Sequence, residues 1–100
     1  MAPGEIEAVI SELPQVIEVC VVSAADAKFG EAPAAVIYAT ETVTASDVIG
    51  HCRERLAGYK VPRHVIVVAE PLERMASGKI ARRKIRDAHP ELAADALSVG

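Results

Sequence analysis

The chain of 100 residues contains no tryptophan, two tyrosines and one phenylalanine. Because hydrophobic residues still make up 51% of it, the core has to be built from valine, isoleucine, leucine and alanine. The chain also lacks an excess of positive over negative charge. The formal net charge is −3, whereas a general nucleic-acid binder needs a basic surface that neutralises phosphates. A chain of this length predicts a single domain, residues 1–100, with a small core of its own.

Signals for metal binding, export and membrane insertion are also missing. Cys20 and Cys52 lie in apolar segments, no Cys-x-x-Cys pair occurs, and the histidines have no ligand spacing. We therefore expect two reduced, buried thiols and no metal site. The N-terminus lacks a basic segment followed by an apolar one, and no apolar run approaches the roughly 20 residues that cross a bilayer. These absences predict a cytoplasmic protein with no membrane span.

The spacing of apolar residues predicts two longer helices. Pro3 opens the first, whose apolar residues recur at helical spacing as far as Leu13, and Pro14 ends it. Thr44 begins the second, and Asp47 makes a weaker form of the capping box with it. Gly58 is expected to end this helix.

Three β-branched or apolar runs predict strands, at residues 16–22, 34–40 and 64–69. The first two strands are expected to pair as a hairpin-like unit across a polar loop at residues 23–30. A last short helix is predicted at residues 80–89, and the alanine-rich tail at residues 91–100 is expected to fray. The order helix–strand–strand–helix–strand–helix predicts an α+β fold, a small three-stranded sheet with helices packed on it.

The segment around Gly78 and Lys79 carries the most chemical information. Gly78 permits a tight backbone turn, and Lys79 follows it at the expected start of the last helix. Arg82, Arg83 and Arg86 then recur on one helical face. Cations near a helix N-terminus oppose the helix dipole, which is understandable if an anion binds there. Charge alone leaves two interpretations open, an anion site and a solvated basic face.

A nucleotide-binding P-loop is excluded at this segment. That motif needs a glycine five residues before Gly78 and a serine or threonine directly after Lys79. The chain has Glu73 and Ile80 at these positions.

Five short segments decide the interpretation by their order: residues 3–7 (PGEIE), 13–16 (LPQV), 30–33 (GEAP), 59–62 (YKVP) and 76–82 (ASGKIAR). Together they resemble the successive landmarks of the C-terminal domain of adenylate-forming ligases, the superfamily of the acyl-CoA synthetases. The family has a Pro-Arg-Thr-like triplet where this chain has Glu73, Arg74 and Met75. Because the proline and the threonine are missing, the loop before Lys79 is expected to be set differently.

The resemblance implies that the chain is the mobile C-terminal lid of a larger acyl-CoA (fatty-acid-CoA) ligase. Lys79 matches the lysine that bridges the carboxylate and the α-phosphate during adenylation, and Gly78, Arg82, Arg83 and Arg86 are candidates for positions near the phosphates. ATP and CoA would be substrates of the full enzyme, and Mg²⁺ would belong to the larger N-terminal domain. That domain would be the main partner, and the isolated chain is expected to bind none of these groups and to be inactive.

The family also implies a protein lysine acetyltransferase and a deacylase that act on Lys79. Other origins remain open: a peptide-synthetase adenylation unit, a luciferase-like enzyme, or a stand-alone binding module that uses the basic helix at residues 79–86. The Arg-Arg-Lys-Ile-Arg sequence at residues 82–86 favours an acyl-CoA synthetase. The negative net charge and the lack of stacking aromatics near the basic cluster argue against the module.

Overall fold

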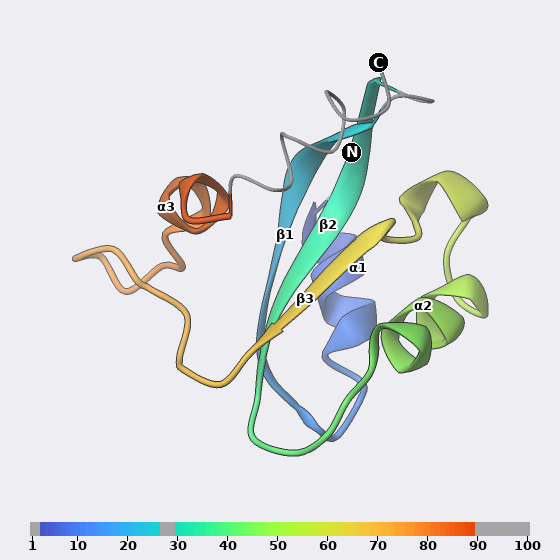
Figure 1. Ribbon diagram of the computed structural model, residues 1–100, viewed down its shortest axis with the longest axis horizontal. Coiled ribbons are helices and arrows are strands. Elements are labelled where there is room, and N and C mark those ends of the chain that lie inside the picture. The colour runs from blue at the N-terminus through green and yellow to red at the C-terminus, as the bar shows by residue number, and fades with distance from the viewer. Residues whose placement is uncertain (1–2, 27–29, 90–100) are drawn as a thin grey trace.

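A computed structural model describes residues 3–26 and 30–89, and the tail expected to fray lies outside them (Figure 1). Its single sheet has the strand order β1-β2-β3. The strands are β1 (Val16–Asp26), β2 (Gly30–Ala39) and β3 (His64–Val68). β2 is central, antiparallel to β1 and parallel to β3.

The helices are α1 (Pro3–Ile10), α2 (Ala45–Arg53) and α3 (Arg82–Asp87), and a 3-10 turn, η1 (Gly58–Lys60), lies between α2 and β3. This order confirms the predicted α+β fold. None of the described helices has the length and apolarity that crossing a membrane requires.

The sheet is apolar on both faces, because alternate residues of each strand point to opposite sides. Val19 and Val21 of β1 face α1 and α2, whereas Cys20 and Val22 face the segment that leads into α3. On the first face, α1 and α2 contribute fully buried side chains: Ile6, Ile10, Val48 and Cys52. On the second face, Leu72 and Ile85 cover the sheet. The described part of the chain therefore has three layers, and α3 is the only one of its helices on the second face (Figure 1).

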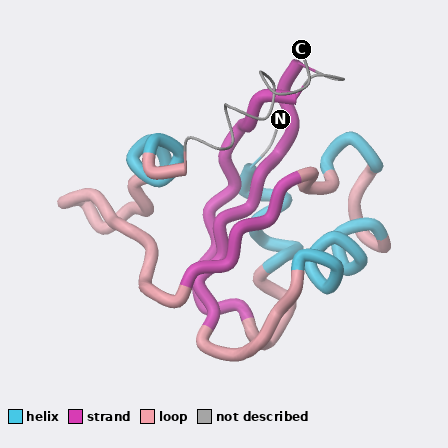
Figure 2. The backbone as a smooth tube through the Cα atoms, viewed as in Figure 1, coloured by secondary structure: helices cyan, strands magenta, loops and turns pink. Residues whose placement is uncertain are grey.

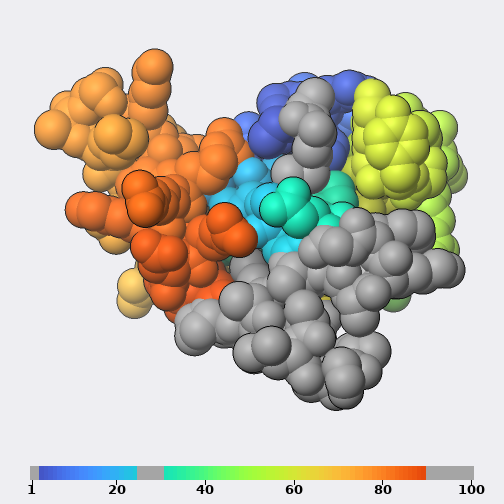
Figure 3. Space-filling model, turned by 90° about the horizontal axis from the view of Figure 1, so that it is seen from above, coloured from blue at the N-terminus to red at the C-terminus, as the bar shows by residue number. Residues whose placement is uncertain are grey.

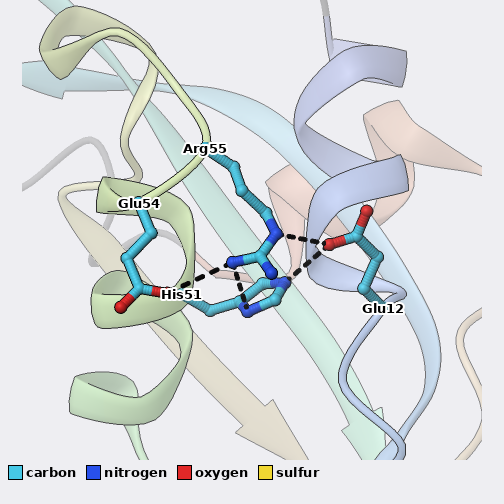
Figure 4. A network of polar contacts seen from close by, with 4 residues as sticks. All are labelled: Glu12, His51, Glu54 and Arg55. Carbon is cyan, nitrogen blue, oxygen red and sulfur yellow. Dashed lines mark hydrogen bonds and ion pairs between the residues drawn. The ribbon is translucent and has the colours of Figure 1, made fainter.

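A polar network joins the C-terminal ends of α1 and α2 (Figure 4). One carboxylate oxygen of Glu12 is 2.9 Å from His51 Nε2 and 2.9 Å from Arg55 Nε. Arg55 also lies 3.2 Å from a carboxylate oxygen of Glu54. The network lies beside the apolar contact between the two helices.

The predicted capping box is confirmed. Thr44 Oγ1 accepts a hydrogen bond from the Asp47 backbone N–H at 3.1 Å, and Asp47 Oδ2 accepts one from the Thr44 N–H at 3.0 Å. The helix stops sooner than predicted, however, at Arg53 with Glu54 as its C-cap. Gly58 begins η1 instead of ending α2.

Two other boundaries were predicted wrongly. β1 continues to Asp26, where a loop at residues 23–30 was expected, because Ser23 pairs with Pro33 and Ala24 with Ala32. Small side chains continue a strand when the partner strand supplies the hydrogen bonds. The first helix ends at Ile10. After it, the Leu13 N–H bonds to the Ile10 carbonyl at 3.0 Å, the tighter pattern that closes a helix ahead of a proline.

Candidate functional site

The segment between β3 and α3 forms a short hairpin, where the sequence predicted an open loop up to Gly78. Arg74 and Ile80 form an antiparallel bridge. The Met75 N–H donates to the Lys79 carbonyl at 2.7 Å, and the Gly78 N–H donates to the Met75 carbonyl at 2.9 Å. Figure 2 shows this hairpin projecting from the sheet as part of a long connection.

Gly78 is needed in this hairpin for its backbone conformation. Its φ is +90°, and no other described residue has a positive φ. A three-residue hairpin loop ends in such a left-handed position, which glycine adopts without the strain that a Cβ brings. A Cβ at Gly78 would meet nothing within 4 Å, so space is not the constraint.

Lys79 follows this turn and is exposed. It was predicted at the mouth of the last helix, but α3 begins only at Arg82, because Lys79 and Ile80 belong to the second arm of the hairpin. Lys60 is 2.9 Å from Glu5 and Lys84 is 3.2 Å from Glu73. Within residues 3–26 and 30–89, no carboxylate forms an ion pair with the Lys79 ammonium, so its charge is available to a ligand.

Arg82 is held by the protein. Its Nη1 is 2.6 Å from Glu7 Oε2 and also donates to the Val21 carbonyl. The hydrogen bond with Glu7 raises the pKa of Arg82, more than burial lowers it. The same Glu7 oxygen accepts from the Val21 N–H at 2.8 Å. Arg82 thus ties the start of α3 to β1 and α1.

Arg83 and Arg86 are exposed, and they line a depression together with Arg82, Pro3 and Val22. The predicted common face of the three arginines is therefore present. It lies on α3, beside the hairpin that carries Lys79.

A second concave region lies beside η1. It has a volume of ≈ 370 Å³, and its lining includes Tyr59, Lys60, Arg63 and Glu31. Tyr59 is 76% exposed, and the Lys60 ammonium lies 5.7 Å from the centroid of its ring. The hydrogen bond to Glu5 is the main cause that raises the pKa of Lys60.

The Lys79 hairpin and α3 lie on one side of the sheet and η1 lies on the other, although Ser23 lines both concave regions. The hairpin and α3 are at the left of Figure 1 and η1 is at the right, and the view from above separates them in the same way (Figure 3). No group of three or more His, Cys, Asp or Glu side chains that could hold a metal ion occurs in the described part of the chain.

The model of the AMP-binding enzyme C-terminal domain family matches residues 5–79. The chain belongs to this family. It is 45% identical over 87 residues to a 2-succinylbenzoate–CoA ligase from Listeria monocytogenes, a match that covers 87% of the chain and 18% of that protein. The chain thus spans about a fifth of the length of such relatives.

Solved structures of CoA ligases contain the same fold. A Mycobacterium tuberculosis fatty acyl CoA synthetase matches with a TM-score of 0.82 and 38% identity, over 91% of this chain and 18% of that one. The o-succinylbenzoate CoA synthetase from Bacillus subtilis, in complex with the acyl-adenylate intermediate OSB-AMP, matches with a TM-score of 0.80 and 37% identity, over 87% of this chain and 18% of that one. These relatives and structural neighbours are CoA ligases, and the chain matches about 18% of the length of each.

Three residues that organise the site were missed by sequence reasoning. In the sequence, Glu7 is one of two glutamates near a helix start, Glu18 interrupts an apolar strand, and Arg74 belongs to the divergent triplet. Their partners are far away in the sequence: Arg82 is 75 positions from Glu7, and Arg74 is 56 positions from Glu18. The sequence signals only Glu18, as a single charged residue inside an otherwise apolar run.

Proposed function

We propose that this chain is the C-terminal domain of an acyl-CoA ligase and that Lys79 supplies the positive charge for carboxylate activation. The observation that carries the proposal is the state of Lys79: an exposed ammonium on a hydrogen-bonded hairpin, without an acidic partner among the described residues. The relation to CoA ligases supports the choice of reaction.

The first step joins the acid to the nucleotide. A carboxylate oxygen attacks the α-phosphorus of ATP, a P–O bond forms, and the bond to the β-phosphate oxygen breaks as pyrophosphate leaves. Negative charge builds on the phosphoryl oxygens, and a positioned ammonium stabilises it. Lysine suits this task because it is a compact cation with free donors and an ordinary pKa of about 10.4. Arg83 and Arg86, exposed on the neighbouring helix, extend the same positive surface.

The second step forms the thioester. The CoA thiol loses its proton, its sulfur attacks the acyl carbon, and AMP leaves with the electron pair of the broken C–O bond. The pocket beside η1 offers this step an exposed aromatic ring, Tyr59, next to the side chains of Lys60 and Arg63. Because this pocket and Lys79 lie on opposite sides of the sheet, a rotation of the domain against a larger N-terminal domain would use them in turn. The acid, including any fatty acid, would be selected by that larger domain, which would also hold ATP and Mg²⁺.

The test is to replace Lys79 in the ligase that contains this chain and its larger domain. We expect Lys79→Ala to slow carboxylate-dependent pyrophosphate exchange by about 10²–10³-fold, the usual cost of losing one preorganised donor. Thioester formation from supplied acyl-adenylate is expected to persist. Lys84→Ala is the matched control, since Lys84 is an exposed lysine that is already paired with Glu73.

Equal losses in both half-reactions would contradict the assignment of Lys79 to adenylation. The isolated chain is expected to catalyse no pyrophosphate exchange, because the reactants are held elsewhere. Exchange activity that stays with the purified chain through repeated purification would contradict the proposed division of work.

A further inference from the structure

Arg74 makes two contacts at once, one with Gly78, the residue before Lys79, and one with Glu18 of the sheet. Its Nη1 donates a hydrogen bond to the Gly78 carbonyl at 2.9 Å, across the hairpin. Its Nη2 donates to Glu18 Oε2 of β1. One planar guanidinium therefore connects the turn before Lys79 to the body of the sheet.

Glu18 is itself fixed. Its side chain is only 14% exposed, and its other carboxylate oxygen accepts a hydrogen bond from the Leu72 N–H at 2.8 Å. Leu72 is buried in the apolar cluster beneath α3, at the beginning of the connection that forms the hairpin. One oxygen of the Glu18 carboxylate thus binds the start of the hairpin segment. The other oxygen binds the Arg74 guanidinium, which is hydrogen-bonded to the turn of the hairpin.

Beyond Arg74, the hairpin is tied to α3 by the exposed ion pair between Glu73 and Lys84, a kind of pair that contributes little stability. Residues 73–79 are all exposed, and half-buried Ile80 is the apolar side chain that packs from its second arm onto the cluster. A short two-stranded hairpin is marginally stable in water on its own. Without an anchor, the Lys79 ammonium would sample many positions, and activation by a positioned charge loses rate steeply with small misplacements.

We propose that Arg74 is a positioning residue for Lys79, acting through the Gly78 carbonyl and anchored by Glu18. This inference rests on the proposed role of Lys79. It accounts for a hydrogen-bonded hairpin in a chain that lacks the proline and threonine of the triplet, because the arginine between Glu73 and Met75 connects the hairpin to the sheet.

The structural readout uses the 100-residue chain. Backbone ¹⁵N order parameters at Gly78 and Lys79 are measured in the wild type, Arg74→Gln and Arg74→Lys. We expect values near those of rigid backbone, about 0.85, in the wild type and values towards 0.6 in Arg74→Gln. Arg74→Lys is expected to be intermediate, because an ammonium keeps a charge opposite Glu18 but lacks the fork that also reaches Gly78.

Arg55→Gln is the matched control. Arg55 is similarly exposed, 44% against 48% for Arg74, and also pairs with a glutamate, but its partner Glu12 belongs to the network between α1 and α2. This control should leave the order of the hairpin unchanged. Glu18→Gln is a second route to the same loss, since the amide oxygen still accepts from the Leu72 N–H while the charge opposite Arg74 is removed.

The functional readout uses the ligase that contains this chain. Arg74→Gln is expected to lower kcat for adenylation by about 10–100-fold, with KM for ATP and acid nearly unchanged, since these would bind the larger domain. Unchanged order at Gly78 and Lys79 in Arg74→Gln and Glu18→Gln would overturn the proposal. Full adenylation activity in Arg74→Gln would also overturn the proposal, provided that Lys79→Ala greatly lowers this activity in the same enzyme. Full adenylation by Lys79→Ala would instead refute the proposed function, and the order parameters would still decide whether Arg74 holds the hairpin.

Discussion

Replacing Glu7 tests how α3 is attached to the rest of the domain. The Glu7 carboxylate lies between α1, β1 and α3 and is 20% exposed; it accepts from the Val21 N–H and pairs with Arg82. Glu7→Ala leaves the Val21 N–H without its acceptor, at a cost of about 1–3 kcal/mol. Arg82 is 44% exposed, so it regains water, and the lost pair adds at most about 1 kcal/mol.

The sum predicts a loss of about 1–4 kcal/mol in the free energy of unfolding. For a chain of this size, each kcal/mol lowers Tm by roughly 4–8 °C. Glu7→Gln keeps an acceptor for Val21 and should lose about 1 kcal/mol. Urea unfolding followed by circular dichroism measures these differences, and a double-mutant cycle with Arg82→Gln isolates the pair.

Glu5→Ala is the matched control, because it removes a glutamate from the same helix. Glu5 is 47% exposed and pairs with Lys60 at the surface, so its replacement should change Tm little. If Glu7→Ala were no more destabilising than Glu5→Ala, the reasoning from the buried Val21 contact would be refuted.

Two further predictions concern pH and modification. The hydrogen bond from the Leu72 N–H, and then Arg74, lower the pKa of Glu18 below its ordinary 4.5. The wild type should therefore be more stable than Glu18→Gln by a constant amount above about pH 4.5, and it should lose this advantage as the pH falls through the lowered pKa. Urea unfolding between pH 3 and 7 measures the difference, and a difference that does not change with pH would contradict the prediction. A protein lysine acetyltransferase supplied with acetyl-CoA should modify Lys79 ahead of Lys84 and Lys60, because these two lysines are paired with acids. Mass spectrometry identifies the modified lysines, and even modification of all three would contradict the prediction.

Local patterns in the sequence were sufficient to predict which helices and strands form and in what order. The capping box of Thr44 and Asp47 and the apolar spacing of Ile6 and Ile10 depend on neighbours within a few residues, and both appear in the structure as predicted. The end of β1 was missed because Ala24 and Asp26 have weak strand preferences, and only the pairing with β2 keeps them extended.

The turn at Gly78 was predictable from the sequence, whereas the role of Lys79 stays a prediction and the hairpin was not foreseen. Gly78 and Lys79 were identified from the segment that contains them, and Gly78 does adopt the turn conformation expected of glycine. The hairpin was missed because its hydrogen bonds join Met75 to Lys79 and Glu73 to Ala81, and the spacing of apolar residues in the sequence gives no sign of this pairing. The roles of Glu7 and Glu18 depend on arginines far along the chain, so these roles appear only once the sheet is assembled.

The central claim, that the ammonium at position 79 drives adenylation, can be tested by removing and restoring that charge. Lys79→Cys is made in the proposed ligase, this chain together with its larger domain. The variant is then treated with 2-bromoethylamine, whose carbon is attacked by the thiolate with loss of bromide. The chain's own thiols should not compete, since Cys20 and Cys52 are fully buried and burial raises the pKa of Cys20 to about 11. The wild-type enzyme, treated in parallel, controls for cysteines elsewhere.

The account predicts that Lys79→Cys loses pyrophosphate exchange by about 10²–10³-fold and that aminoethylation restores most of it. Treatment with iodoacetamide, which adds a neutral group of similar length, should restore none. Equal recovery with both reagents, or full exchange activity in untreated Lys79→Cys, would contradict the claim.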